Sequence, residues 1–121
     1  MRLDSGQLEL TTVQRRFDAV ASSFDTADFV HRKTCDGLLE RLEPMQVDAN
    51  VILDLGAATG KGGRTLKKVY RTATIINFDI SSEMLKIALR NRSILSRYNP
   101  ILVQGDAARI PLRDGCVDLV F

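Results

Sequence analysis

Two kinds of hydrophobic pattern divide the chain. In the N-terminal third, apolar residues recur every three or four positions, which is the spacing of amphipathic helices. From residue 51 onward, short continuous apolar runs alternate with segments of helical spacing, as in a parallel sheet with its connecting helices. The pattern predicts helices over residues 11–23, 26–43, 61–70 and from 82 onward, and strands over 51–55, 73–79, 99–104 and 116–121.

The two N-terminal helices each predict one buried face. Pro44 ends the second helix, because proline lacks the amide that would continue helical hydrogen bonding. Ser81 or Ser82 caps the helix that begins near residue 82, with Glu83 in its first turn. The buried faces are expected to consist of Val13, Phe17 and Val20 in the first helix, and of Phe29, Val30, Thr34, Leu38, Leu39 and Leu42 in the second.

The alternation of strands and helices from residue 51 onward predicts an α/β fold, a Rossmann-like parallel sheet sandwiched by helices. Residues 1–45 then form an N-terminal helical segment, and residues 46–121 form the N-terminal half of the α/β domain. The chain ends at Val120 and Phe121 inside an apolar run, whereas a doubly wound domain has about six strands. We therefore expect an N-terminal fragment, truncated in the fourth strand, with the C-terminal half absent; a small complete domain is the alternative.

A fragment of this kind exposes the edge of its fourth strand and the apolar faces of its helices. Unpaired strand edges and exposed apolar surface both promote association between copies. We therefore expect self-association of the fragment through the exposed fourth-strand edge, and no activity of the fragment alone.

The composition is that of one ordinary globular domain, with 121 residues, 45% of them hydrophobic and 26% charged. No apolar run approaches the roughly 18 residues of a membrane helix, and the N-terminus lacks the apolar core of a signal peptide. Cys35 and Cys116 have no metal-binding or redox spacing, which indicates reduced thiols of a cytoplasmic protein. His31 is the single histidine, so a histidine-based metal site is not expected.

The net charge of +2 conceals an uneven distribution along the chain. Residues 1–54 carry six basic and ten acidic side chains, whereas residues 61–97 carry nine basic and two acidic ones. The basic block falls on two predicted helices, where it is either a solvated face or a docking surface for an acidic partner. A nucleic-acid partner is not indicated, because such surfaces interleave aromatic with basic residues and only Tyr70 and Tyr98 lie near.

The segment VILDLGAATGKGG, residues 51–63, joins the first predicted strand to a glycine-rich turn. A triphosphate loop needs four residues between its two glycines and a hydroxyl residue after its lysine. Here three residues separate Gly56 from Gly60, and Gly62 follows Lys61. A triphosphate loop is therefore rejected.

A dinucleotide fingerprint, G-x-G-x-x-G, fits the same turn only weakly. Counted from Gly60, the third glycine position is occupied by Thr65. The acid that such a site requires is present, because Asp79 ends the second predicted strand. A dehydrogenase of the Rossmann type therefore stays open as an alternative.

Three carboxylates lie at the ends of successive strands: Asp54, Asp79 and Asp106. Ligands of open α/β sheets bind beyond the carboxyl ends of the strands, so these acids are expected to converge on one crevice. Such a site would repel a pyrophosphate and suits a ligand that offers hydrogen-bond donors and positive charge. The acids therefore favour a nucleoside cofactor without phosphate.

Residues 50–121 resemble the class I S-adenosylmethionine-dependent methyltransferases, whose motifs occur here in family order and at family spacing. The motifs are DLGAATG at 54–60, FDIS at 78–81, GDAARIP at 105–111 and DGCVDLVF at 114–121. The N-terminal segment RRFDAVASSFDTADFVHRKTCDGLLERL resembles the leader of the members that methylate malonyl-acyl-carrier protein in biotin biosynthesis. It also resembles bacterial relatives of a mitochondrial complex I assembly factor.

The resemblance implies that the glycine-rich turn holds the methionine end of S-adenosylmethionine. Gly56, Ala57, Ala58 and Gly60 would form the loop whose backbone approaches the cofactor. Ala58 stands where the family usually has glycine, and its methyl group would narrow the site. Asp54 would support the loop or reach the methionine amino group through water.

The other two acids are implied to bind the nucleoside. Asp79 would accept hydrogen bonds from both ribose hydroxyls, since a carboxylate has the two oxygens that a diol needs. Ile80 would pack on the adenine. Asp106 would accept from the adenine amino group, with the Ala107 amide near a ring nitrogen.

The resemblance makes residues 1–45 a lid over the cofactor. Phe24 stands where the family often has tyrosine, and Phe24 and His31 are candidates for substrate contact. The implied reaction is direct displacement at the methyl group, for which a carboxylate acceptor needs no general base.

The methyl acceptor is not fixed by these residues. The resemblance implies malonyl-acyl-carrier protein as the substrate, and the acidic carrier as a partner for the basic block. A methyltransferase-fold protein with another acceptor or role, such as a complex I assembly factor-like protein hydroxylase, stays open as an alternative.

Overall fold

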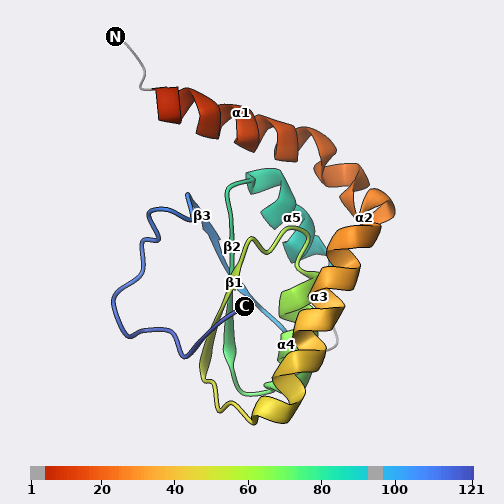
Figure 1. The fold of residues 1–121 in the computed structure, drawn as a ribbon, viewed down its shortest axis with the longest axis vertical. Coiled ribbons are helices and arrows are strands. Elements are labelled where there is room, and N and C mark those ends of the chain that lie inside the picture. The colour runs from red at the N-terminus through yellow and green to blue at the C-terminus, as the bar shows by residue number, and fades with distance from the viewer. Residues whose placement is uncertain (1–4, 93–96) are drawn as a thin grey trace.

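The structure is a computed structural model that describes residues 5–92 and 97–121. Within these ranges the helices are α1 (Ser5–Val20), α2 (Phe24–Ala27), α3 (Phe29–Leu42), α4 (Lys61–Val69) and α5 (Ser82–Arg90), with 3-10 helices η1 (Ala21–Ser23) and η2 (Glu43–Met45). The strands are β1 (Val51–Leu55), β2 (Thr74–Asp79), β3 (Ile101–Gln104) and β4 (Leu119–Val120) (Figure 1). Any continuation of the helix expected from residue 82 into residues 93–96 falls outside the described residues.

The described strands form one parallel sheet in the order β3-β2-β1-β4. Ile52, Leu53, Ile75 and Phe78 of the two central strands are almost fully buried, as expected for parallel strands that are covered on both faces. Because all strands run in the same direction, their carboxyl ends meet at one edge, the upper edge in Figure 1. The predicted Rossmann-like α/β fold is confirmed.

The two faces of the sheet are covered differently. Helices α3, α4 and α5 lie against one face, and the irregular segment 105–118 lies against the other (Figure 1). The connections from β1 to β2 and from β2 to β3 step in the same direction, so right-handed crossovers place α4 and α5 on one side. Ile52 packs in the core on the helix side, whereas Leu112 and Val117 cover Phe78 on the other side. Within the described residues, helices therefore cover one face and not both.

The helix predicted over residues 26–43 is interrupted, and the prediction of one continuous helix is wrong. Asp28 adopts a non-helical conformation, with φ −101° and ψ 57°, between α2 and α3. Its carboxylate accepts a hydrogen bond from the His31 amide at 3.2 Å and so caps α3. The apolar spacing continues across the break, which is why periodicity alone did not locate it.

The apolar faces predicted for the N-terminal helices are largely exposed. In α1, Val13, Phe17 and Val20 are 37%, 40% and 46% exposed, and in α3 Leu38 is 43% exposed, so their predicted burial is wrong.

In α3, Leu39 and Leu42 pack against the core on the helix side of the sheet. Phe29 and Val30, by contrast, are 62% and 76% exposed, so their predicted burial is wrong. The Phe29 ring instead lies 5.0 Å from Lys33 Nζ, in the geometry of an exposed cation–π contact.

The N-terminal helices surround the edge of the sheet where the functional residues were predicted. Figure 1 shows α1 above the carboxyl ends of the strands and α3 beside α4. Helix α1 contacts α5, and η1 contacts both α5 and α2. None of the described helices is both long and apolar enough to cross a membrane.

Candidate functional site

A cavity of about 350 Å³ lies between the carboxyl ends of the strands and the N-terminal helices. We call it the carboxyl-edge cavity. It is within the size range of small-molecule sites. Three carboxylates line it, those of Asp28, Asp79 and Asp106, whereas none of the described lining residues is Lys or Arg. The other lining residues are Phe17, Phe24, His31, Gly56, Ala58, Phe78, Ile80, Met84, Gly105 and Ala107.

The glycine-rich turn begins at the end of β1 and requires left-handed backbone at three positions. Gly56, Ala58 and Gly60 have φ values of 77°, 48° and 84°. Glycine adopts this region without strain, whereas Ala58 must place a methyl group there. That methyl group packs in a cluster with Ala21 of η1 and Met84 of α5. Ala58, which departs from the family pattern, is therefore accommodated by contacts of its methyl group with η1 and α5.

Asp79 fixes the turn from the neighbouring strand. Its Oδ2 accepts a hydrogen bond from the Ala58 amide at 2.9 Å, and its Oδ1 accepts one from the Ser81 amide at 2.9 Å. The residue is only 9% exposed, so both bonds are shielded from water. Each carboxylate oxygen has two acceptor positions, and one on each oxygen is left for a ligand in the cavity.

A second, smaller cavity of about 120 Å³ lies on the other side of the turn, between α3, β1 and α4. We call it the inner cavity. Asp54 lines it and is 5% exposed, and its Oδ2 has no hydrogen-bond partner among the described residues. Burial raises the pKa of Asp54 to about 6, against the opposing effect of a hydrogen bond from the Gly63 amide. A buried acceptor without a partner is a polar group suited to a ligand's donor.

Asp54 should make the stability of the protein depend on pH. Its carboxyl group binds a proton more tightly in the folded protein than at the unfolded value of 3.8, so folding is favoured at low pH and this contribution is lost as the pH rises through about 6. We expect the contribution of Asp54 to the free energy of unfolding to fall by about 2 kcal/mol between about pH 4 and 6.5. Urea denaturation at a series of pH values measures it.

The matched variant for this pH experiment is Asp54→Asn, which keeps the shape of the side chain and cannot titrate. Its stability should decline less than that of the unchanged protein over the same pH range. Parallel pH profiles of the two proteins would show that another group is responsible.

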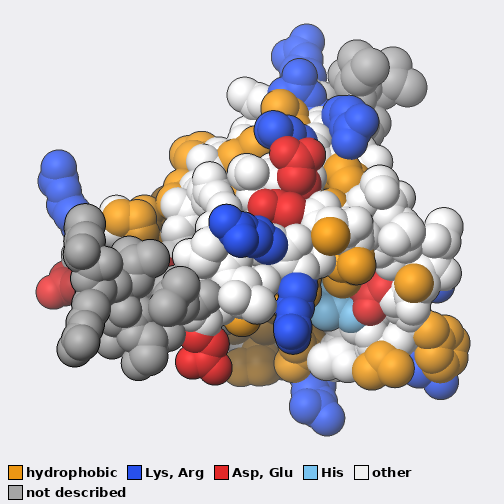
Figure 2. Space-filling model, turned by 90° about the horizontal axis from the view of Figure 1, so that it is seen from above, with side chains coloured by type: hydrophobic (Ala, Val, Ile, Leu, Met, Phe, Trp, Pro, Cys, Tyr) orange, Lys and Arg blue, Asp and Glu red, His pale blue; other side chains and the backbone are white. Residues whose placement is uncertain are grey.

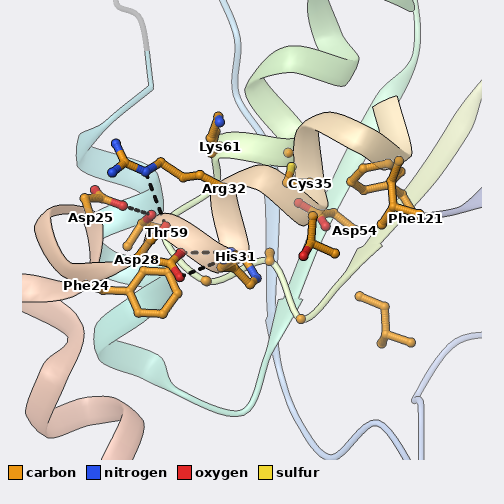
Figure 3. Close-up of a pocket in the computed structure, with 17 residues that line it drawn as sticks. Phe24, Asp25, Asp28, His31, Arg32, Cys35, Asp54, Thr59, Lys61 and Phe121 are labelled. Atoms are coloured by element: carbon orange, nitrogen blue, oxygen red, sulfur yellow. Dashed lines mark hydrogen bonds and ion pairs between the residues drawn. The ribbon is translucent and has the colours of Figure 1, made fainter. Parts of the chain in front are cut away.

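His31 stands where the two cavities meet, since it lines both. Its Nδ1 lies 3.0 Å from Asp28 Oδ2, and its ring meets that of Phe24 edge to face with centroids 5.4 Å apart. Figure 3 shows this group on one side of the inner cavity, with Asp54 across it. The contact with Asp28 orients the imidazole and leaves Nε2 directed away from the carboxylate.

Three acids of the N-terminal helices hold these helices to the parts of the chain that surround the cavities. We call them the lid acids: Asp18, Asp25 and Asp36. Asp18 accepts a hydrogen bond from the Ser81 hydroxyl, and Asp25 accepts one from the Thr59 hydroxyl in the turn. Asp36 forms an ion pair with Lys61, at 2.9 Å, at the start of α4. Figure 2, seen from above, shows acidic, basic, apolar and histidine side chains together on this face.

The structure brings most of the predicted site residues together. Of the nine predicted cofactor-binding residues, six line the carboxyl-edge cavity: Gly56, Ala58, Asp79, Ile80, Asp106 and Ala107. Asp54 and Ala57 line the inner cavity. Gly60 lines neither cavity, and it approaches Ala88 of α5 so closely that an added Cβ would lie 2.9 Å from the Ala88 Cβ. Phe24 and His31, predicted for the substrate, line both cavities. Contact of these residues with a cofactor or substrate stays a prediction.

A role at the site was not predicted for the lid acids, and it was not predicted for the cavity-lining residues Asp28 and Phe17 either. The excess of acidic residues over basic ones in residues 1–54 was a signal that this segment accepts hydrogen bonds or forms ion pairs with side chains elsewhere in the chain. It did not indicate the partners, because they are 25 or more residues away in sequence. In the ranges that the structure describes, no group of three or more His, Cys, Asp or Glu side chains could hold a metal ion.

Several malonyl-[acyl-carrier protein] O-methyltransferases are similar to this chain. Malonyl-[acyl-carrier protein] O-methyltransferase of Halorhodospira halophila is 37% identical over 98% of this chain and 39% of its own length. The protein of the same name from a Methylovorus species is 31% identical over 100% of this chain and 42% of its own length. The chain thus spans about two fifths of the length of these relatives.

Solved structures support the fold. A chain of the complex between the Haloferax volcanii Trm112 methyltransferase activator and a candidate methyltransferase aligns with a TM-score of 0.68 at 24% identity, covering 86% of this chain and 45% of that one. The DhpI-SAM-HEP complex aligns with a TM-score of 0.58 at 24% identity, covering 87% and 45%. A family model described as a methyltransferase domain matches residues 52–121, which is more than half of the chain, and the chain therefore belongs to the methyltransferase domain family.

Proposed function

We propose that the full-length protein transfers a methyl group from S-adenosylmethionine to the free carboxylate of malonyl-acyl-carrier protein. The observation that carries the cofactor assignment is the charge of the carboxyl-edge cavity, which has three carboxylates and no Lys or Arg among its described lining residues. A pyrophosphate would be repelled there, whereas ribose hydroxyls, amino groups and a sulfonium are donors or carry positive charge. This distribution of charge favours S-adenosylmethionine over a nicotinamide dinucleotide.

The residues of the cavity fit the nucleoside end of this cofactor. Asp79 has a free acceptor position on each oxygen, as a ribose diol requires. Ile80 supplies an apolar side chain beside it for a flat base. Asp106 already accepts from the Ala108 amide at 2.9 Å, which orients its carboxylate and leaves acceptor positions for an exocyclic amino group.

The methionine end fits the glycine-rich turn and the inner cavity. Gly56 is exposed and an added Cβ there would meet nothing within 4 Å, so its backbone is open to a ligand. The unpartnered Oδ2 of Asp54 is an available acceptor in the inner cavity for an ammonium group, directly or through water. A carboxylate paired in this way would be ionised more readily, since a nearby positive charge lowers a carboxyl pKa.

When bound, S-adenosylmethionine supplies a methyl group on a sulfonium, which is electrophilic without further activation. The protein then has to align the acceptor and exclude water. Phe17 and Phe24 of the lid cover the cavity with apolar rings. His31, oriented by Asp28, offers an imidazole nitrogen to the acceptor's carboxylate and so positions it. An ionised carboxylate is itself the nucleophile, so no proton has to be removed.

The acceptor in this proposal comes from the relatives, which are named malonyl-[acyl-carrier protein] O-methyltransferases and match nearly all of this chain.

The proposal also includes a cytoplasmic location and association between copies, and both have physical support. Cys35 and Cys116 are free thiols, which fits the reducing cytoplasm. Among the described strands β4 is an edge strand with Val120 58% exposed, which supports pairing between copies at that edge.

The test is methyl transfer by the full-length protein. Incubated with S-adenosylmethionine and malonyl-carrier protein, it should add one methyl ester, detected as a single methyl mass increment on the carrier. Acetyl-carrier protein, which lacks the free carboxylate, should gain none. Binding of NAD with no binding of S-adenosylmethionine would refute the proposal, and so would equal methylation of both carriers.

A further inference from the structure

A third hollow, of about 680 Å³, lies on α4 and is lined mainly by cations. We call it the basic hollow. Five of its seven described lining residues are basic and none is acidic. The basic residues are Lys61, Arg64, Lys67, Lys68 and Arg71. Neither the fold nor the cofactor site accounts for this concentration of charge.

Two of the four cations on α4 oppose the local preferences of a helix, whereas Lys67 and Lys68 lie in its last turn, where the helix dipole favours cations. The helix, KGGRTLKKV, carries four basic residues and no acidic one. Lys61 and Arg64 stand in or near its first turn, where the positive end of the helix dipole disfavours cations. Arg64 and Lys68 are four positions apart, a spacing at which like charges cost about 0.2–0.5 kcal/mol. Residues that oppose local stability in this way are typical of a functional surface.

Part of this charge is already engaged within the chain and part is free. Three of the cations have contacts: Lys61 with Asp36 at 2.9 Å, Arg64 with the Thr59 carbonyl at 2.7 Å, and Lys67 with the Ala73 carbonyl at 2.6 Å. Lys68 and Arg71 are exposed, and neither side chain has an ion pair or hydrogen bond with any described residue. These two therefore present uncompensated positive charge to a partner.

We propose that the basic hollow is the surface on which the acidic carrier protein docks. This inference rests on the proposed function, which supplies the carrier. Complementary charge steers two proteins into one orientation and speeds their encounter. Lys61 borders both the basic hollow and the inner cavity, so an acyl arm from a carrier docked on α4 reaches the site past Lys61. Lys61 and Arg64 are held by their contacts within the chain, so the route of the acyl arm past Lys61 keeps its shape. Lys68 and Arg71 bind the carrier.

An acidic protein suits this surface better than a nucleic acid does. Single-stranded nucleic acids are held by exposed aromatic rings between the cations. Tyr98 is the one aromatic residue among the described residues that line the hollow, and it is 6% exposed. The charges therefore lie on a surface that can attract an acidic partner but offers no ring on which a base could stack.

The test reverses the two free charges in the full-length protein, as Lys68→Glu with Arg71→Glu. At low salt, kcat/KM for malonyl-carrier protein should fall about 10-fold or more, and the difference should shrink as salt rises. Turnover of the malonyl thioester of N-acetylcysteamine, which has no carrier, should stay within about twofold. The control is Arg90→Glu with Arg113→Glu, which changes the net charge equally at exposed positions outside the three cavities and should leave both activities unchanged.

Each other outcome is decisive. Unchanged kcat/KM for the carrier at low salt would overturn the docking surface and leave the proposed function standing. Methylation of neither substrate by the unchanged protein would overturn both. Loss of nucleic-acid binding in a mobility-shift assay, with carrier turnover intact, would assign the surface to a nucleic acid instead. If reversal also impairs the small thioester, Lys68→Ala with Arg71→Ala is the second variant, and it must show a carrier-specific loss for the inference to stand.

Discussion

The Asp79→Ala variant should bind S-adenosylmethionine at least about 100-fold more weakly than the unchanged protein. Removing the carboxylate takes away the acceptors for both ribose hydroxyls, and hydrogen bonds to a charged group contribute about 1.5–3 kcal/mol each. It also leaves the Ala58 and Ser81 amides without their side-chain acceptor, whereas the Gly56 and Ala57 amides still donate to the Phe78 carbonyl and keep the turn on β2. Isothermal titration calorimetry on the full-length protein measures the affinity.

Asp118→Ala is the matched control for this effect. Asp118 Oδ2 also accepts two backbone amides, from Asn50 and Val51, both at 2.9 Å. It lies next to the start of β1 and lines none of the three cavities. Asp118→Ala should lower stability while affinity for the cofactor stays within about threefold, because no ligand-facing acceptor is lost. A similar loss of affinity in both variants would mean that Asp79 acts only by stabilising the fold.

The Gly63→Ala variant should lower the free energy of unfolding by about 3 kcal/mol, at the upper end of the range for overpacked cores. Gly63 is buried in α4 against β2, and an added Cβ would lie 2.7 Å from Asn77 Oδ1 and 2.8 Å from the Tyr98 hydroxyl. Both distances are below van der Waals contact, and Asn77 is 1% exposed, so its side chain has little room to move. Urea denaturation measures the loss.

Gly37→Ala provides the opposite result at a matched position. Gly37 lies within α3, and an added Cβ there would meet nothing within 4 Å. Alanine is favoured over glycine inside a helix by about 0.5–1 kcal/mol, so this variant should be more stable than the unchanged protein. Equal stabilities of the Gly63→Ala and Gly37→Ala variants would show that the close approach of α4 to β2 is not the reason for glycine at position 63.

The sheet and the position of the site could be predicted because both depend on local sequence. Val51–Leu55 is an apolar run with one acid, Asp54, and the structure places β1 over the same five residues. Asp79 and Asp106 were expected to meet because parallel strands end at one edge, and the carboxyl-edge cavity contains both. Asp54 ends a strand as well, but it points into the inner cavity on the helix side. The direction in which a side chain points from this edge of the sheet depends on the pleat of the strand and on the turn after it. The spacing of residues in the sequence does not give that direction.

The lid could be predicted only in outline. Its helices follow from the spacing of apolar residues, whereas its attachment follows from single polar contacts such as Asp25 with Thr59. Contacts between residues so far apart leave no periodic signal in one sequence. The same holds for Ala58, whose packing with Ala21 and Met84 could not be read from the sequence. Ala58 also lines the carboxyl-edge cavity, and the narrowing of the cofactor site by its methyl group stays a prediction.

The lid acids bear on the rates at which a ligand enters and leaves. A molecule in the carboxyl-edge cavity would lie between the strands and the side chains of Phe17 and Phe24, so an outward movement of the N-terminal helices would open the cavity further. That movement breaks the contacts of Asp18, Asp25 and Asp36 together, because one run of helices carries all three. Where opening of the helices limits ligand exchange, these contacts would slow entry and departure alike and leave the equilibrium affinity unchanged.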